Sequence, residues 1–337
     1  MRTAFIFVVA LFAACSYNTE IPTEFPTPQP PPSATPLPKL DLKRDAALEK
    51  QFAEIAKDAK GKVGVAAVVL ETGDAALLNA DGHYPMQSVY KLPIAMAVMD
   101  EVRKDNHSLD EQIGVTKDDY VRQGQASPLR DKNPDGGVFT LRELIRLALV
   151  ESDGSASDVL LRVIGGPTVV QSYLSQIGVE DMKVVNTEKE LGKDWETQYQ
   201  NWATPTEATN LLRYLFETRE DPPSDRTVQH FGRIGINPIG DNGTLLIQGM
   251  IESTTGPKRI KGLLPRPDDG WIVAHKTGTS GSGGGVTAAT NDIGIIYLPN
   301  GKHLAVAVFV SDSPADDKTR EAVIARIAKA AWDKWSK

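Results

Sequence analysis

The sequence predicts a fold of two parts, an α/β domain built from both ends of the chain and an all-α domain inserted between them. Two observations predict it. Residues 63–70 and 303–310 are strand-like runs that lie far apart in the sequence. The middle of the chain instead repeats apolar residues at helical spacing, as in residues 141–150. Because strands lie at both ends of the chain and helices in the middle, we expect both ends in one α/β domain.

The chain begins with the pattern of an export signal. Arg2 precedes an apolar run that ends at Ala14, and this run is too short to span a bilayer. Small residues then precede Cys15, the only cysteine, as in a bacterial lipoprotein signal. Residues 1–14 are therefore predicted to be a signal peptide, and Cys15 the lipidated first residue of an exported, membrane-tethered periplasmic protein. Ordinary cleavage that leaves Cys15 as an unmodified thiol is the alternative.

Residues 15–41 are predicted to be a proline-rich linker that follows the anchor. Eight of the 22 prolines of the chain lie between Pro22 and Pro38. Such a segment favours extended polyproline II structure and would act as a stiff spacer. It would hold a folded domain away from a membrane surface, and a leader with no role is the alternative.

Hydrophobic periodicity then predicts the elements in order. The α/β domain, residues 42–83 and 244–337, is predicted to contain a helix at 43–59, a hairpin of strands at 63–70 and 75–79, strands at 271–276, 292–298 and 303–310, and a closing helix at 315–335. The helical domain, residues 84–243, is predicted to contain helices at 88–103, 141–150, 156–164 and 205–218. A cleft between two such domains is a common place for an active site.

The composition excludes several classes of function. The formal net charge is -7, with a pI near 5.4, whereas proteins that bind nucleic acid normally carry a basic face. One cysteine excludes an intrachain disulfide. The five histidines include no His-x-His or His-x-x-x-His pair, which argues against a metal site. We expect a monomer that binds no nucleic acid, metal or cofactor.

Ser88 and Lys91 are the first candidates for chemistry. They lie three residues apart at the start of a predicted helix, so the hydroxyl and the amine share one face. A serine needs an adjacent base to become a nucleophile, and Lys91 can serve if its site is mostly apolar. The free backbone N–H groups of the helix start would stabilise a developing oxyanion beside Ser88. A surface serine at a helix start is the alternative.

A second candidate motif ends a predicted strand and is followed by a glycine-rich stretch over residues 280–285. It consists of Lys276, Thr277, Gly278 and Thr279. A lysine and hydroxyls at a strand edge can bind a carboxylate, and a backbone N–H group there can complete an oxyanion hole. A strand that runs into a flexible loop is the alternative.

Ser152 and Glu188 are two further candidates. Ser152 begins a Ser-Asp-Gly sequence between two predicted helices, where its hydroxyl could relay a proton, although a simple helix cap has the same pattern. Glu188 lies in a polar stretch without strong periodicity, where a carboxylate could position and deprotonate a water. By itself, Glu188 is one of many solvated glutamates.

The four motifs occur in the order Ser-x-x-Lys, Ser-Asp-Gly, Glu-x-x-Leu and Lys-Thr-Gly, and this order resembles the class A serine β-lactamases. The resemblance covers nearly all of residues 43–337. In residues 86–98, 198–206 and 273–281 the chain is similar to the extended-spectrum VEB and PER branch. The resemblance implies a β-lactamase/transpeptidase-like two-domain fold, α/β plus all-α, with an antiparallel sheet flanked by helices and an inserted helical domain. It also implies a periplasmic hydrolase that opens β-lactam antibiotics, penicillins and cephalosporins, through an acyl-serine intermediate.

The resemblance further implies a role for each candidate residue. In catalysis, Ser88 is the nucleophile and Lys91 is its proton partner. Ser152 relays a proton to the β-lactam nitrogen, and Glu188 activates the deacylating water. Whether Glu188 also activates Ser88 is disputed in the family. In substrate binding, the resemblance implies Lys276, Thr277, Gly278, Thr279 and Ser280 around the substrate carboxylate, with Arg259 supporting Lys276. The backbone N–H groups of Ser88 and Thr279 would form the oxyanion hole.

Several positions depart from the family pattern. Gly154 replaces a common asparagine that contacts substrate, and Gly192 replaces the asparagine that helps to hold the hydrolytic water. Asn186 and Asn201 stand where many members place an Arg–Asp ion pair, so we expect that clamp on the Glu188 loop to be missing. Residues 222–243 are predicted to be a surface insertion.

Two alternatives share this fold. A penicillin-binding D,D-peptidase has the Ser-x-x-Lys and Lys-Thr-Gly motifs but lacks a deacylating carboxylate such as Glu188. A non-hydrolytic penicillin-recognising module would be supported only by Gly154 and Gly192. The intact set of candidate catalytic residues favours the hydrolase.

Overall fold

The computed structural model of the chain describes residues 34–218, 242–265 and 273–337. The predicted signal peptide, Cys15 and most of the predicted linker lie outside the described residues. So do residues 271–272 of one predicted strand and residues 222–241 of the predicted insertion. Among the helices that the structure describes, none is long and apolar enough to cross a membrane.

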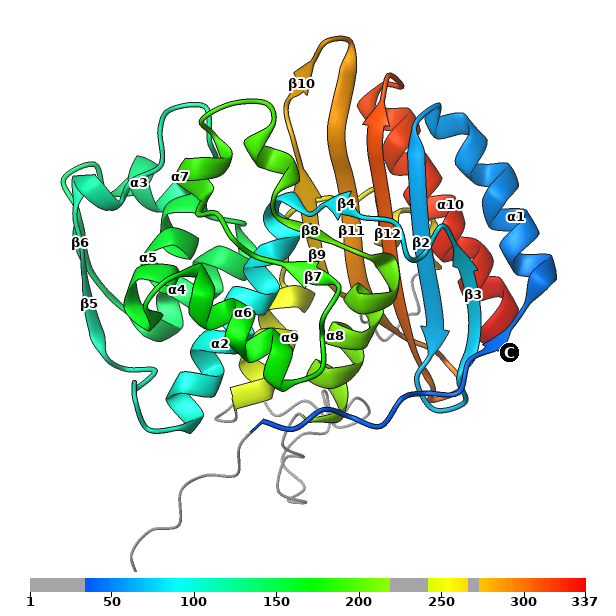
Figure 1. The fold of residues 1–337 in the computed structure, drawn as a ribbon, viewed down its shortest axis with the longest axis horizontal. Coiled ribbons are helices and arrows are strands. Elements are labelled where there is room, and N and C mark those ends of the chain that lie inside the picture. The colour runs from blue at the N-terminus through cyan, green and yellow to red at the C-terminus, as the bar shows by residue number, and fades with distance from the viewer. Residues whose placement is uncertain (1–33, 219–241, 266–272) are drawn as a thin grey trace, which may run out of the picture. The chain divides into compact units, whose positions relative to one another are not determined.

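A seven-stranded sheet joins the two ends of the described chain, as the sequence predicts (Figure 1). Its strands run in the order β1-β3-β2-β12-β11-β10, and β9 also pairs with β11. The strands are β1 (Lys43–Arg44), β2 (Lys62–Val69), β3 (Asp74–Leu78), β9 (Val273–Thr279), β10 (Ser282–Gly283), β11 (Val286–Tyr297) and β12 (His303–Ser313). The pairings are antiparallel except that β1 runs parallel to β3 for two residues, a small departure from the predicted antiparallel sheet.

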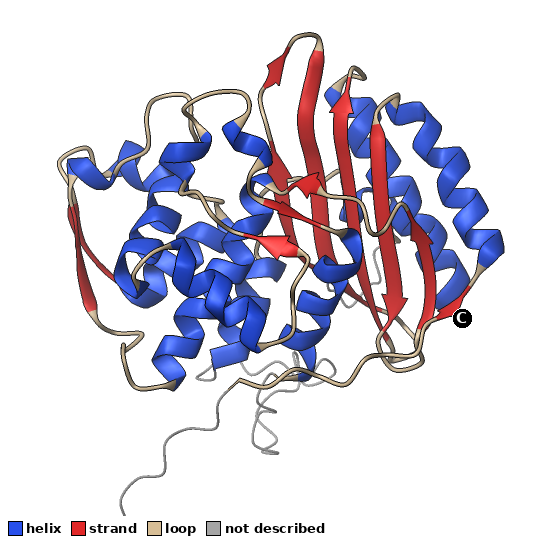
Figure 2. Cartoon of the chain, in the orientation of Figure 1, coloured by secondary structure: helices blue, strands red, loops and turns tan. Residues whose placement is uncertain are grey.

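Both faces of this sheet are covered, which explains why its central strands are apolar at almost every position. Helices α1 (Ala46–Ala56) and α10 (Asp317–Trp335) cover one face, and the helices of the inserted part lie on the other side (Figure 2). Alternate residues of β12 face opposite cores. Those facing α1 and α10 are Leu304, Val306, Val308 and Val310, and those facing the inserted part are Ala305, Ala307 and Phe309.

Helix α2 (Lys91–Arg103) lies at the centre of the helical part. All of its residues from Lys91 to Asp100 are buried, and α4, α5, α6 and α9 pack around it. The other helices of this part are α3 (Pro128–Lys132), α4 (Leu141–Val150), α5 (Gly154–Ile164), α6 (Pro167–Gln176), α7 (Glu188–Leu191), α8 (Pro205–Glu217) and α9 (Asn242–Ile251). A central buried helix gives a rigid base to residues at its N-terminus.

Short elements complete the described chain. The strands are β4 (Tyr84–Pro85), β7 (Met182–Lys183) and β8 (Trp202–Ala203) in one small sheet, and β5 (Gln112–Val115) and β6 (Gly137–Thr140) in another. The 3₁₀ turns are η1 (Lys57–Ala59), η2 (Gln87–Tyr90), η3 (Lys117–Asp119), η4 (Thr197–Tyr199) and η5 (Ile260–Leu263). These strands and the helices α3, α6, α7 and α9 are not predicted from the sequence, because most of them are too short to show a period.

Two predicted elements differ from the structure near the site. The helix predicted at 88–103 begins as the 3₁₀ turn η2 and becomes α-helical only at Lys91. Gln87 has a φ of 48°, in the left-handed region, so an α-helix does not extend back through it. The strand predicted at 292–298 is longer and starts at Val286, because both of its faces are buried and no polar alternation marks its first half.

Candidate active site

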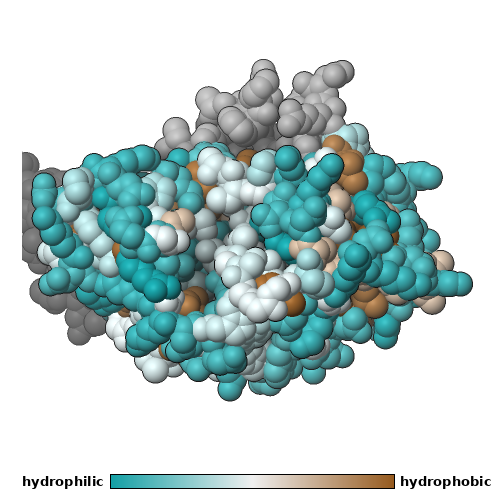
Figure 3. Space-filling view, turned by 90° about the horizontal axis from the view of Figure 1, so that it is seen from above, coloured by the Kyte–Doolittle hydropathy of each residue, from teal (hydrophilic) through white to brown (hydrophobic). Residues whose placement is uncertain are grey.

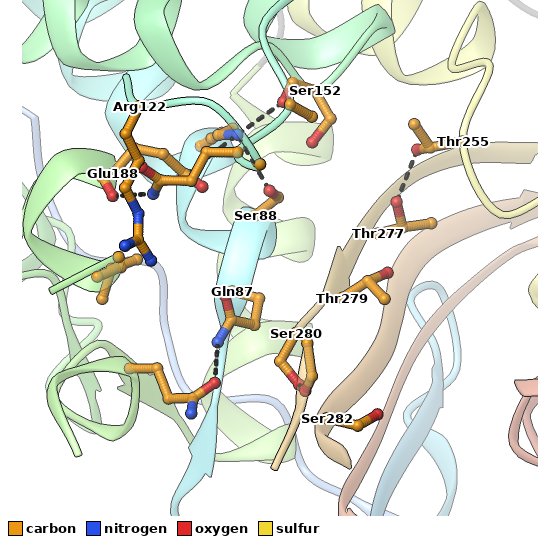
Figure 4. A pocket seen from close by; sticks show the side chains of 18 of the residues that line it. Gln87, Ser88, Arg122, Ser152, Glu188, Thr255, Thr277, Thr279, Ser280 and Ser282 are labelled. Atoms are coloured by element: carbon orange, nitrogen blue, oxygen red, sulfur yellow. Dashed lines mark hydrogen bonds and ion pairs between the residues drawn. The ribbon is translucent and has the colours of Figure 1, made fainter. Parts of the chain in front are cut away.

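A cavity of about 800 Å³ lies between the β9–β10 side of the sheet and the turn η2, the segment just before α5, and helix α7 (Figure 4). Its lining includes Ser88, Lys91, Ser152, Glu188, Thr277, Thr279 and Ser280. In Figure 3, pale atoms of intermediate hydropathy gather in the middle of the view, between hydrophilic regions. The cavity therefore brings together residues from all four predicted motifs. Lys276, Gly278, Gly154 and Arg259 lie behind this lining rather than in it.

The turn η2 presents Ser88 to the cavity. The residue before it, Gln87, is held in its left-handed conformation while its buried amide donates to Gln198 at 3.1 Å. Ser88 Oγ accepts a hydrogen bond from Lys91 Nζ at 3.0 Å. The prediction that the hydroxyl and the amine share one face is confirmed.

Lys91 links three parts of the site. Its side chain is only 1% exposed. Besides Ser88, its ammonium donates to the carbonyl of Ser152 at 2.7 Å and lies 3.3 Å from Glu188 Oε2. Such charge-assisted contacts, made away from bulk water, hold the lysine between the serine and the carboxylate.

Ser152 has strained backbone geometry, with a φ of 58°. This conformation turns its carbonyl toward Lys91, while its hydroxyl accepts from Lys276 Nζ at 2.8 Å. The next residue, Asp153, caps α5 by accepting from the N–H of Ala156. The Ser-Asp-Gly motif is thus both a helix cap, through Asp153, and a source of a hydroxyl in the site. Strain of this kind costs of order 1–3 kcal/mol and is concentrated at functional sites.

Lys276 lies on β9 and is completely buried. Burial, and then the nearby charge of Lys91, lowers the pKa of Lys276 well below its ordinary value. Farther along the cavity wall, the hydroxyls of Thr277 and Thr255 lie 2.6 Å apart. The Lys-Thr-Gly strand thereby offers hydroxyls to one side of the cavity, with the Lys276 amine buried behind them.

Arg259 supports a different residue from the one the sequence suggested. It is buried, and its guanidinium donates to the hydroxyl of Thr279 at 2.8 Å and to the carbonyl of Gly278 at 3.2 Å. No hydrogen bond joins it to Lys276, also a described residue; Arg259 acts on Lys276 only through its charge. It therefore holds the end of β9 from behind the cavity.

Gly278 is required by a close approach of two backbones. A methyl group at this position would lie 2.1 Å from the carbonyl oxygen of Met86, just before η2. Only glycine lets β9 pack this closely against the segment that carries Ser88.

Glu188 is the first residue of α7 and has a side chain 15% exposed. The helix is anchored from α5, where the Asp158 carboxylate accepts from the backbone N–H of Glu188 at 2.6 Å and of Lys189 at 3.0 Å. Burial raises the pKa of Asp158 to about 7, against the lowering effect of these two hydrogen bonds. Asp158 belongs to no motif and could not be identified from the sequence, because its contact with α7 depends on tertiary packing.

The two glycines that depart from the family pattern both make room for neighbours. A methyl group at Gly154 would lie 2.8 Å from Cγ of Glu188, so the glycine lets that side chain rest against the start of α5. A methyl group at Gly192 would lie 2.8 Å from the amide of Gln125. That amide donates to the carbonyl of Glu188 at 2.5 Å. Gln125 was not identified from the sequence, since it belongs to no motif.

The expectation of a missing clamp is half right. The charged pair is absent, but the buried side chain of Asn201 ties the same loop together. Its Oδ1 accepts from the N–H groups of Val185 at 2.8 Å and Asn186 at 2.9 Å, and its Nδ2 donates to the carbonyl of Asn186 at 2.9 Å. Hydrogen bonds from one amide therefore take the place of the ion pair.

No group of three or more His, Cys, Asp or Glu side chains that could hold a metal ion occurs among the residues described. The arrangement of the contacts in the cavity suits covalent catalysis. A hydroxyl nucleophile contacts a lysine, the lysine contacts a carboxylate, and a second lysine contacts a second hydroxyl.

Comparisons with known proteins agree with this arrangement. The Beta-lactamase enzyme family matches residues 47–228 and 241–335. The VEB-1 β-lactamase of Pseudomonas aeruginosa is 37% identical over 286 residues, which cover 85% of this chain and 89% of that protein. The PER-1 extended-spectrum β-lactamase of the same organism is 35% identical over 285 residues, covering 85% and 86%.

Solved structures give the same result. The crystal structure of the TLA-3 extended-spectrum β-lactamase matches with a TM-score of 0.76 and 41% identity, covering 86% of this chain and 99% of that one. A β-lactamase from Chitinophaga pinensis matches with a TM-score of 0.75 and 40% identity over the same shares. The chain belongs to the β-lactamase enzyme family, with the class A fold.

Proposed function

We propose that this protein hydrolyses β-lactam antibiotics through an acyl-enzyme intermediate on Ser88. The observation that carries the proposal is the continuous set of contacts in one cavity. Lys91 contacts Ser88, the Ser152 carbonyl and Glu188, and Lys276 contacts the Ser152 hydroxyl. A nucleophile, candidate bases and a proton relay that touch one another suit acyl transfer.

In acylation, Ser88 Oγ attacks the carbonyl carbon of the ring amide and the ring C–N bond breaks. The Ser88 proton passes to a base, and Ser152 delivers its own proton to the leaving nitrogen. Ser152 is resupplied from Lys276, and Lys276 is reprotonated with the proton that the base took from Ser88, so that one proton moves in total from Ser88 to the nitrogen. Lys91 lies between Ser88 and Glu188, so the base is Lys91 itself or Glu188 reached through it. The backbone N–H groups of Ser88 and Thr279 form the oxyanion hole.

In deacylation, Glu188 takes a proton from a water molecule, the water oxygen attacks the acyl carbonyl, and Ser88 leaves as the free hydroxyl after regaining a proton. The contact between Glu188 and Lys91 supports this role, because it brings the carboxylate next to the nucleophile. It favours a hydrolase over a D,D-peptidase, which lacks such a carboxylate.

Substrate binding is assigned to the β9 side of the cavity. The cation of Lys276 and the hydroxyls of Thr277 and Thr279 suit the carboxylate of a penicillin or cephalosporin. Ser280 extends this polar wall. The relatives named as extended-spectrum enzymes support the inclusion of cephalosporins among the substrates.

Hydrolysis of the chromogenic cephalosporin nitrocefin tests the function. The purified protein should turn nitrocefin over without added metal and with EDTA present, and absence of turnover contradicts the proposal. Glu188→Ala should accumulate an acyl-enzyme, seen by mass spectrometry as an adduct on Ser88. If Glu188→Ala turns over as fast as the parent, Glu188 does not have the role given to it.

We further propose that the enzyme is exported, loses residues 1–14 and is tethered in the periplasm through a lipid on Cys15. The sequence pattern before Cys15 supports this. Labelled palmitate or glycerol should be incorporated in a bacterial host and lost in Cys15→Ser. We propose in addition that the enzyme acts as a monomer, which light scattering of the purified protein tests.

A further inference from the structure

Tyr90 lies inside the Ser-x-x-Lys motif and has no part in the mechanism above. Its side chain is fully buried, and its hydroxyl donates a 2.7 Å hydrogen bond to Glu188 Oε2. We propose that Tyr90 is a positioning residue for the general base: it holds the Glu188 carboxylate through Oε2 and leaves Oε1 for the hydrolytic water. This inference rests on the proposed β-lactamase mechanism.

The contacts of the carboxylate point to this role. Within the described part of the chain, its hydrogen bonds and ion pairs are with Tyr90 and with Lys91, and both are made by Oε2. The backbone of Glu188 is fixed separately, at its N–H by Asp158 and at its carbonyl by Gln125. The backbone contacts place the residue, whereas the tyrosine sets the rotation of its carboxylate.

The packing around Tyr90 makes it a rigid donor. The ring is part of the core of the helical part and leaves no exposed surface. A tyrosine has only two side-chain torsions, so a packed ring holds its hydroxyl in one place. Gly154 contributes by letting Cγ of Glu188 lie against α5, where a larger residue would push it away.

Charge also favours the arrangement. Burial, and then the charges of Glu188 and Asp158, raises the pKa of the Tyr90 hydroxyl well above its ordinary value. The hydroxyl therefore keeps its proton and remains a donor. A hydrogen bond donated to a carboxylate stabilises the ionised form, which is the form that accepts a proton from water.

Four groups act on the ionised carboxylate. Tyr90 from η2, Lys91 from α2 and, at longer range, Lys276 from β9 stabilise it, whereas the charge of Asp158 from α5 opposes it. Removing the tyrosine hydroxyl takes away one stabilising contact and leaves the rest of the set in place.

The test compares Tyr90→Phe with the parent and with Tyr84→Phe. The control removes another buried tyrosine hydroxyl from the same segment, one that makes a 3.5 Å contact with the carbonyl of Asn79 and lies outside the cavity lining. Acylation and deacylation rate constants are measured separately, by quenching and mass spectrometry, across the pH range in which each protein is folded.

For Tyr90→Phe, the deacylation rate constant should be about tenfold lower than that of the parent, the factor expected for losing a hydrogen bond to a charged group. Its acylation rate constant should change less. The Tyr84→Phe profile should match the parent. A Tyr90→Phe profile that superimposes on that of the parent, or an equal fall in Tyr84→Phe, overturns the proposal.

A second measurement needs no turnover. Thermal unfolding of Tyr90→Phe, Glu188→Ala and the double variant forms a double-mutant cycle. The two changes should be clearly non-additive, because each removes the same hydrogen bond, and strict additivity overturns the contact. If the parent does not turn nitrocefin over and Glu188→Ala forms no acyl adduct on Ser88, the proposed function fails, and the cycle still decides whether Tyr90 holds Glu188.

Discussion

The side-chain amide of Gln125 occupies the space that a side chain at position 192 would fill. A methyl group on Gly192 would lie 2.8 Å from both Cδ and Nε2 of Gln125. From this position Nε2 donates to the carbonyl of Glu188 at 2.5 Å. Gln125 and Gly192 therefore form a pair in which the small residue admits the large one, and the large one supports the segment that carries the candidate base.

The pair predicts coupling between two substitutions. Gly192→Ala should lower the free energy of unfolding by about 1 kcal/mol, since its methyl displaces the end of the Gln125 side chain from its hydrogen bond with the Glu188 carbonyl. Gln125→Ala should also destabilise, through the lost hydrogen bond to Glu188. The double variant should be more stable than the sum of the two effects, because Gln125→Ala removes the clash. Urea unfolding of the four proteins measures this, and simple additivity would show that the residues do not share the space.

The close approach at Gly278 predicts that one added methyl group lowers the free energy of unfolding by a large amount. Gly278→Ala would bring Cβ to 2.1 Å from the Met86 carbonyl oxygen, which is backbone and cannot rotate away. We expect a loss of about 2 kcal/mol or more in the free energy of unfolding, together with a fall in the acylation rate as η2 shifts. Gly114→Ala on β5 is the matched control, since nothing lies within 4 Å of its added methyl. Equal stability of the two variants would contradict the close approach.

The raised pKa of Asp158 predicts that the difference in stability between Asp158→Asn and the parent depends on pH. Its pKa in the folded protein is about 7, against an ordinary value of 3.8. Between these values the folded protein keeps a proton that the unfolded chain has lost, so this residue's contribution to stability falls as pH rises, by up to about 1.4 kcal/mol per pH unit. Asp158→Asn has no such proton, so its stability relative to the parent should increase over this window and level off above it. Denaturant unfolding at several pH values measures the trend, and a constant difference between the two proteins rules it out.

The lowered pKa of Lys276 predicts how KM depends on pH. Burial and the charge of Lys91 lower its pKa well below the ordinary value. Its ammonium, the form suited to the substrate carboxylate, is therefore lost at lower pH than in an ordinary lysine. KM should rise with pH above that point, by up to about tenfold per unit. Lys276→Arg keeps its charge, so its KM should stay flat over the same range. Steady-state kinetics on one penicillin decide this, and parallel KM curves would exclude Lys276 as the cause.

The parts of the site that are close in sequence could be predicted, and the reason is local geometry. Ser88 and Lys91 meet because residues three apart share a helical face, and this holds although η2 is a 3₁₀ turn. The two-part fold also followed from the positions of strand and helix patterns. The contact of Lys276 with Ser152 spans 124 residues. It was expected only through the order of motifs shared with a known family.

The supporting residues could not be predicted, because their contacts arise from packing between distant elements. Gln125 and Asp158 contact the Glu188 segment across 63 and 30 residues. Tyr90 lies inside the Ser-x-x-Lys motif, yet the sequence alone predicts only a core residue for an aromatic side chain at this position. Its contact with Glu188 becomes evident only when the position of Glu188 is known. Asn201, in place of a charged residue, predicts the loss of a clamp on the Glu188 segment. The sequence shows that the charges are missing, but it does not show the backbone groups that the Asn201 amide contacts.

The amide of Asn201 gives the Glu188 segment an anchor that carries no charge. An ion pair at a protein surface weakens as ionic strength rises, because mobile ions screen it within about 10 Å at 0.1 M salt. It also fails when either partner gains or loses a proton. Hydrogen bonds from a buried amide to backbone groups respond to neither change. The segment that carries the candidate base should therefore keep its place in dilute and in salty surroundings alike.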